Sequence, residues 1–223
     1  MSQGTYVHRT VRLGAAFLIF GAVEFIVGMI VVQSQYPGYS LSQNYISDLG
    51  GAHSPWALGF DASVIILGLC AIVGALQIWG AFDPSGGRAL GLGFLLIAGI
   101  GAVGVGVFPE TTPVLSGGMH TIVSFIAFLG AGIGLTSLSF ATARGPPWRV
   151  FRPLTLACGL VTLAAIVLFS LGQFGASAYY LDLGPGGMER LVVAPVLLWA
   201  IVEGVHLAGL PRYAPSVPVR STA

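Results

Sequence analysis

Six long apolar runs dominate this chain of 223 residues and leave few folds open to it. A helix needs roughly 18 or more mostly apolar residues to cross a membrane, and each run meets that length. A water-soluble fold would have to bury all six runs in one core. Only 8% of the residues are charged, whereas a soluble domain has about 25%. The sequence therefore predicts an all-α, polytopic integral membrane protein, a single membrane domain over residues 1–223 that crosses the cell membrane several times.

Turn signals between the runs set the expected helix boundaries. Ser54-Pro55 has the form of an N-cap followed by proline at the first helical position. The segments DPSGG at 83–87 and RGPPWR at 144–149 are typical of breaks between helices. We expect a six-transmembrane-helix bundle with helices at about 11–33, 55–79, 88–107, 119–141, 153–174 and 189–210.

The basic residues are all arginines, and their positions predict the orientation of the bundle. In the six-helix arrangement, eight of the nine fall on one side of the membrane: Arg9, Arg12, Arg88, Arg144, Arg149, Arg152, Arg212 and Arg220. Only Arg190 falls on the other side. Because cytoplasmic loops carry the excess of positive charge, we expect the N and C termini to be cytoplasmic. Net charge near zero gives no indication of nucleic-acid binding.

Glycine patterns inside the runs indicate helix packing. Gly14, Gly21 and Gly28 recur every seven residues, and Gly130 and Gly134 form a G-x-x-x-G pair. The segment GIGAVG at 99–104 has the spacing of a dinucleotide-binding motif. It lies within an apolar run without a preceding strand, so we interpret it as helix packing too.

Polar groups gather on the predicted outer face, above all in the segment NYISDLGGAHSP at 44–55. Asp61 lies early in the second helix and is expected to point into the bundle. His120 begins the fourth helix, with Ser124 one turn below it. The candidate ligand-binding residues are Asn44, Ser47, Asp48, His53, Asp61, Glu110, His120, Ser124, Glu189 and Arg190.

Two chemistries suit this cluster. His53, His120 and a carboxylate such as Asp48 or Asp61 are ligand types that zinc prefers, and bound zinc would activate water for hydrolysis of a lipid. The spacing matches no established zinc motif. In the alternative, the same groups fasten the loop onto the helix ends and Arg190 pairs with a carboxylate.

Two further acids fall deep within the apolar runs. Glu24 lies in the middle of the first run, and Glu203 lies in the last run with His206 three residues later. Ionisable side chains inside a membrane are costly, so each is a candidate functional group. A proton relay between them would require an intervening group, because they differ in depth by about 10 Å.

The ordered segments NYISDLG, SPWALGFDASVIILG, GVGVFPE, MHTIVSFIAF and GGMERLVV resemble the DUF998 family of six-helix membrane proteins of unknown function. The order is also similar to that of the Frag1/DRAM/Sfk1 group, whose members are tied to lipid organisation. The resemblance implies that the family motif positions are Ser47, Asp48, Gly50, Pro109, Glu110, His120, Glu189 and Arg190. It also implies that the outer polar cluster lies near lipid headgroups.

The leading hypothesis is a membrane protein whose outer polar pocket binds a lipid headgroup or small polar ligand, with membrane lipid as its partner. Asp48, His120 and Arg190 would be its central groups. Two alternatives stay open at this point, so the sequence does not decide whether the chain is an enzyme. One is a membrane-embedded, metal-dependent hydrolase acting on lipid, and the other is a small proton-coupled transporter using Glu24 and Glu203.

Overall fold

The structure is a computed structural model that describes residues 3–110, 116–141 and 148–209. All regular structure in these ranges is helical, and six helices are long and apolar enough to cross a membrane. The prediction of an all-α, six-span membrane protein is therefore confirmed. The long helices are α1 (Gln3–Ser34), α2 (Ala57–Ile78), α3 (Gly86–Val107), α4 (Ser116–Leu138), α5 (Trp148–Phe174) and α6 (Gly184–Ala208). Three short 3-10 helices join them: η1 (Ser47–Gly50), η2 (Trp79–Ala81) and η3 (Ser177–Tyr180).

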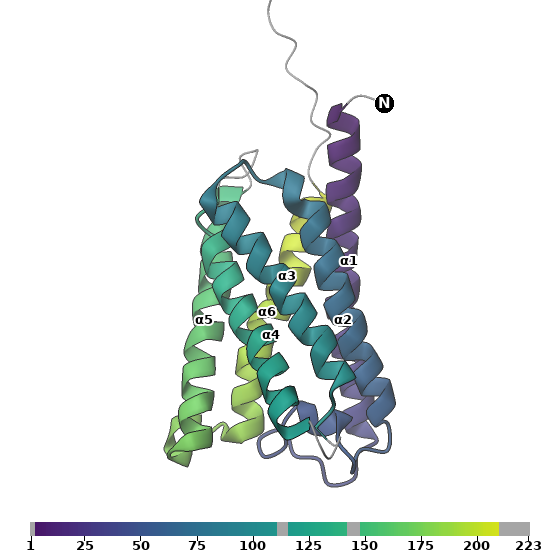
Figure 1. Cartoon of the computed structure of the whole chain (residues 1–223), viewed down its shortest axis with the longest axis vertical. Helices are drawn as coiled ribbons and strands as arrows, with labels where there is room; N and C mark the ends of the chain where they lie inside the picture. Colours follow the sequence, from purple (N-terminus) through teal and green to yellow (C-terminus); the bar gives the residue numbers. More distant parts are fainter. Residues whose placement is uncertain (1–2, 111–115, 142–147, 210–223) are drawn as a thin grey trace, which may run out of the picture.

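The six long helices form a closed ring. Each packs against the next along the chain, and α6 packs against α1 to complete the circle. In Figure 1, α2, α3 and α4 lie in front, with α6 visible behind them and α5 and α1 at the two sides. Such a ring encloses a central space that side chains from several helices must fill.

Glycines lie where neighbouring helices approach most closely. A Cβ at Gly14, Gly21 or Gly28 of α1 would come within 3.0 Å of α2 atoms. Gly130 and Gly134 of α4 meet α3 in the same way, at 2.9 and 3.0 Å. The helix-packing interpretation of both patterns is confirmed, and the GIGAVG segment lies inside α3.

Several predicted helix boundaries are wrong. The first helix begins at Gln3 and the fifth at Trp148, eight and five residues earlier than expected. Ser54 is not the N-cap of α2, because that helix begins at Ala57 and its cap, Trp56, makes no side-chain hydrogen bond. The last helix begins at Gly184, about five residues earlier than expected. Gly184 has a φ of 73° and turns the chain into α6, where Pro185 suits the first turn.

The two ends of the ring differ in charge. We call the end that carries the 35–56 segment the loop end, and the opposite end, where α1 begins and α6 finishes, the terminal end (Figure 1). At the terminal end, Arg12 donates to the Ala208 carbonyl at 2.9 Å and Arg88 donates to the Phe82 carbonyl at 3.1 Å. The predicted cytoplasmic arginines Arg144, Arg212 and Arg220 lie outside the described residues.

Candidate functional site

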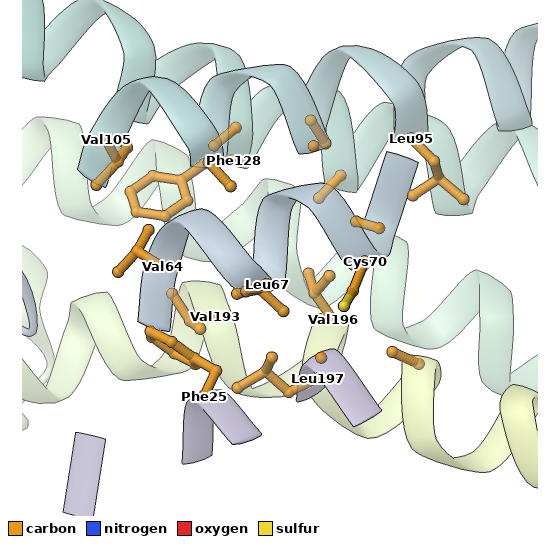
Figure 2. Close-up of a pocket in the computed structure, with 18 of the residues that line it drawn as sticks. Phe25, Val64, Leu67, Cys70, Leu95, Val105, Phe128, Val193, Val196 and Leu197 are labelled. Carbon is orange, nitrogen blue, oxygen red and sulfur yellow. The ribbon is translucent and has the colours of Figure 1, made fainter. Parts of the chain in front are cut away.

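A cavity of about 160 Å³ lies inside the helix ring. This is the size of an apolar cavity that stays dry and accepts a small hydrocarbon. Figure 2 shows side chains from α1, α2, α3, α4 and α6 converging on it. The labelled ones are Phe25, Val64, Leu67, Cys70, Leu95, Val105, Phe128, Val193, Val196 and Leu197. Along α6 the lining runs from Glu189 to Ala200, which corresponds to about 16 Å of helix.

Three side chains at the loop end supply the polar part of this lining. Ser47 comes from η1, Ser124 from α4 and Glu189 from α6. Glu189 is 6% exposed, and its Oε2 accepts a hydrogen bond from the backbone N–H of Ile46. The cavity therefore has a long apolar body and one polar end.

Arg190 fastens the loop to α6. Its Nη1 donates to the carbonyls of Leu41, Asn44 and Gly186 at 2.9, 3.1 and 2.9 Å. Its Nη2 donates to the Tyr39 hydroxyl at 2.6 Å. Burial raises the pKa of Tyr39 while the guanidinium acts in the opposite direction. Three backbone carbonyls and the Tyr39 hydroxyl, rather than the carboxylate considered from sequence, accept these hydrogen bonds from Arg190.

Asp48 organises the loop from within. Its Oδ2 accepts from the Asn44 side chain at 3.0 Å and from the backbone N–H of Tyr45 at 2.9 Å. The Asn44 carbonyl oxygen Oδ1 accepts from the backbone N–H of Ser40 at 3.0 Å. These bonds satisfy backbone donors that the irregular segment would otherwise leave free. Asn44 and Asp48 thus hold Ile46 and Ser47 in place at the end of the cavity.

A second contact ties the loop to α5. Gln173 donates to the Tyr45 hydroxyl at 2.7 Å, and the Tyr45 ring meets Phe169 edge-on at 5.8 Å. Burial raises the pKa of Tyr45 to about 12, so its hydroxyl stays protonated near neutral pH. The loop is therefore bonded both to α5, through Gln173, and to α6, through Arg190.

Glycine at 186 lets the loop approach α6. A Cβ at this position would overlap the Asn44 carbonyl oxygen, and the Gly186 N–H donates to the Ser42 carbonyl at 2.9 Å. Gly50 makes a similar close approach to the Asp61 carboxylate on α2. Only residues without a Cβ allow backbones and side chains this near.

The remaining predicted site residues lie at the loop end but outside the cavity lining. Asp61 is buried in α2, as expected, at 8% exposure. The Nδ1 of His120 lies 2.9 Å from the Phe108 carbonyl, which fixes the ring against the end of α3. His53 and Glu110 are exposed. Of the ten predicted ligand-binding residues, Ser47, Ser124 and Glu189 line the cavity.

The described residues contain no cluster of metal-ligand side chains that would support the zinc hypothesis. Across residues 3–110, 116–141 and 148–209, no group of three or more His, Cys, Asp or Glu side chains could hold a metal ion. Asp48 accepts hydrogen bonds within the loop, while the Nδ1 of His120 faces a backbone carbonyl. His53, His120 and Asp48 are therefore not assembled as a metal site.

The intramembrane acids occupy different places in the ring. Glu24 is half-buried on α1, and its Oε2 has no hydrogen-bond partner among the described residues. Both Glu24 and Ser63 of α2 lie close to Gly28. Glu203 is 1% exposed, and both its oxygens lie 3.3 Å from the Nδ1 of His206. The three-residue spacing noted in the sequence thus places the two side chains in contact.

Sequence reasoning missed the apolar part of the site. Phe25, Val64 and Phe128 look like ordinary membrane-helix residues, and nothing in their type marks a cavity. One signal was present on α6. Glu189, Val192, Val193, Val196 and Ala200 recur at three- and four-residue spacing, so the polar and apolar parts of the lining share one helix face.

The fold and site define a multi-pass helical membrane protein with an internal, mainly apolar cavity. The profile of a family described as "Protein of unknown function (DUF998)" matches residues 19–206, and the chain belongs to this family. That match covers α2 to α5 completely, the second half of α1 and nearly all of α6. Neither the curated proteins nor the solved structures that were compared with the chain gave a match.

Proposed function

We propose that this protein binds part of the hydrocarbon chain of a membrane amphiphile inside its helix ring, with the polar group of that molecule at the loop end. The cavity of about 160 Å³ has room for the carbons nearest that group and not for a whole lipid chain. The observation that carries the proposal is the cavity itself: the described residues that line it are mainly apolar, and Ser47, Ser124 and Glu189 supply hydroxyl and carboxylate groups at its loop end. Ligand sites are typically apolar pockets in which a few polar groups fix the orientation. An amphiphile has the same division into a long apolar part and one polar part.

The loop supports this role by closing the polar end. Ile46 and Ser47 belong to both the loop and the cavity lining. Arg190, Asp48 and Asn44 hold that segment against α6 through hydrogen bonds. In this proposal these residues shape the site rather than touch the ligand, which changes the roles that the sequence suggested for them.

Filling the cavity is expected to abolish binding. Ala127 of α4 lines the cavity, and Ala127→Phe would place a ring in its limited volume. The amphiphile that copurifies with the protein should fall by at least about tenfold in the variant, measured by mass spectrometry of lipid extracts. The matched control is Ile122→Phe, since Ile122 is on the same helix and 55% exposed. Equal retention in both variants, each with an unchanged elution profile, would contradict the proposal.

The arginines support an orientation in which the terminal end faces the cytoplasm. Cys70 and Cys158 are both buried, so an introduced cysteine can report on sidedness. We expect His53→Cys, at the exposed loop end, to react with a membrane-impermeant maleimide in intact cells. Gly86→Cys, at the exposed start of α3 with open space around a Cβ, should react only after permeabilisation. The reverse labelling pattern would show that the loop end, rather than the terminal end, faces the cytoplasm.

The buried Glu203–His206 pair keeps proton-coupled transport as a second candidate function. Its carboxylate lies one turn beyond Trp199 and Ala200, which line the cavity. A carrier of this kind should lose proton-dependent uptake into vesicles in Glu203→Gln, with binding inside the cavity retained. Uptake that does not depend on Glu203 would remove this candidate.

A further inference from the structure

We infer that the bound amphiphile carries a cationic head, a long-chain primary amine or a lipid with a free ammonium group, and that Glu189 is its counter-charge. This inference rests on the proposed function and adds the chemical class of the ligand. It follows from three features of the polar end: the acid itself, the absence of basic groups from the lining, and the charge around it.

Glu189 is a buried acid without a basic partner among the residues that the structure describes. Its Oε2 accepts from the Ile46 N–H, and its side chain lines the cavity. The neighbouring guanidinium of Arg190 donates instead to three carbonyls and to the Tyr39 hydroxyl. The charge of Arg190 acts on Glu189 only through space. A buried carboxylate without a directly paired cation is costly, and an ammonium group placed beside it would reduce that cost.

No lysine, arginine or histidine lies among the described residues that line the cavity. A phosphate or carboxylate head would therefore meet Glu189 without any cation to compensate it. Sites for such anions usually offer arginine, lysine or several backbone N–H groups. The backbone N–H of Ile46 already donates to Glu189 and is therefore not free to bind an anionic head.

The oxygens at the polar end suit a donor of several hydrogen bonds. An ammonium group has three N–H donors and no acceptor. The lining offers the carboxylate of Glu189 and the hydroxyls of Ser47 and Ser124, all of which can accept. An alcohol has only one O–H donor and no charge, so it should bind in the same cavity but more weakly.

The electrostatic potential at the loop end also favours a cationic ligand. Asp48, Glu110 and Asp182 lie at this end with Glu189, and Arg190 is the one arginine placed there by the described helices. An end of a protein with an excess of acids attracts cations and repels anions. The terminal end, with its arginines, has the opposite character.

The test compares four compounds with the same chain: dodecylamine, dodecanol, dodecanoate and dodecyl phosphate. The full chain is reconstituted in nanodiscs of phosphatidylcholine, and binding of each is measured by native mass spectrometry. We expect dodecylamine to bind at least about tenfold more tightly than either anion, with dodecanol between them. In Ala127→Phe all binding above that of empty nanodiscs should be lost, which assigns it to the cavity.

Glu189→Gln isolates the charge. The glutamine oxygen can still accept the Ile46 N–H, so the loop should stay docked while the counter-charge is gone. Dodecylamine should then bind no better than dodecanol, whose own binding is retained. Asp182→Asn is the matched control, because Asp182 is an exposed acid at the same end with a φ of 61°, which asparagine tolerates. This variant should keep the preference for the amine.

The outcomes separate the two claims. If the anions bind as tightly as the amine, or if Glu189→Gln keeps the preference for the amine, the inference about the head group is overturned and hydrocarbon binding stands. If none of the four compounds binds above the empty nanodisc, the proposed function fails and the inference fails with it.

Discussion

Arg190→Ala is expected to destabilise the protein by about 3 kcal/mol and to release the loop from α6. The substitution removes four hydrogen bonds, three of them to the carbonyls of Leu41, Asn44 and Gly186. Those carbonyls lie where the loop meets a helix and would lose their charged donor. The loss of the guanidinium also removes its contact with the Tyr39 ring, 5.5 Å away.

Two measurements test the effect of Arg190→Ala. Thermal unfolding in detergent should begin at a lower temperature, and proteolysis within residues 35–56 should become faster at temperatures where the helices remain folded. Arg9→Ala is the matched control, since Arg9 is an exposed arginine on α1, and it should change neither property. Arg190→Lys keeps the charge but loses the planar fork, so it should fall between the two. An Arg190→Ala protein with wild-type proteolysis would show that the loop does not depend on this residue.

His206→Ala is expected to cost about 3 kcal/mol or more, because it leaves Glu203 buried without its partner. The histidine ring also stacks on Phe151, with centroids 4.1 Å apart, and its removal leaves a cavity beside α5. The effect should appear as a lower midpoint of thermal unfolding in detergent.

A second substitution separates the charge from the packing. Glu203→Gln in the His206→Ala background replaces an unpaired acid by an amide, which is less costly to bury. The double variant should therefore be more stable than His206→Ala alone. His206→Phe, which keeps a ring against Phe151 but cannot bond Glu203, should lose less stability than His206→Ala. If the double variant is the less stable of the two, the acid is not the source of the cost.

The fold was predictable because the membrane makes strong demands on composition. Six apolar runs that are long enough to cross a membrane allow few folds other than a helix bundle. The glycines repeated along one face, Gly14, Gly21 and Gly28, also show which side of α1 packs against α2. Helix ends were less predictable. The entry into α6 depends on the positive φ of Gly184 and on contacts with Ser42, which no local pattern reveals.

The site was predictable only in its polar part. Sequence reasoning identified Asp48, Glu189 and Arg190 as special, since charges are rare in this chain. It could not assign their partners, because Arg190 bonds residues 146 to 151 positions away. The apolar cavity depends on how five helices diverge, and residues such as Phe25 or Val64 would look the same in a filled core.

The docking of the loop also bears on how the chain is made. Residues 39 to 46 leave the ribosome long before Arg190 and Glu189, yet they form their final hydrogen bonds with those two side chains. Until α6 has inserted, the carbonyls of Leu41 and Asn44 lack the Arg190 donor and must be hydrogen-bonded by water instead. The docking of this segment is therefore completed only after α6 has entered the bilayer.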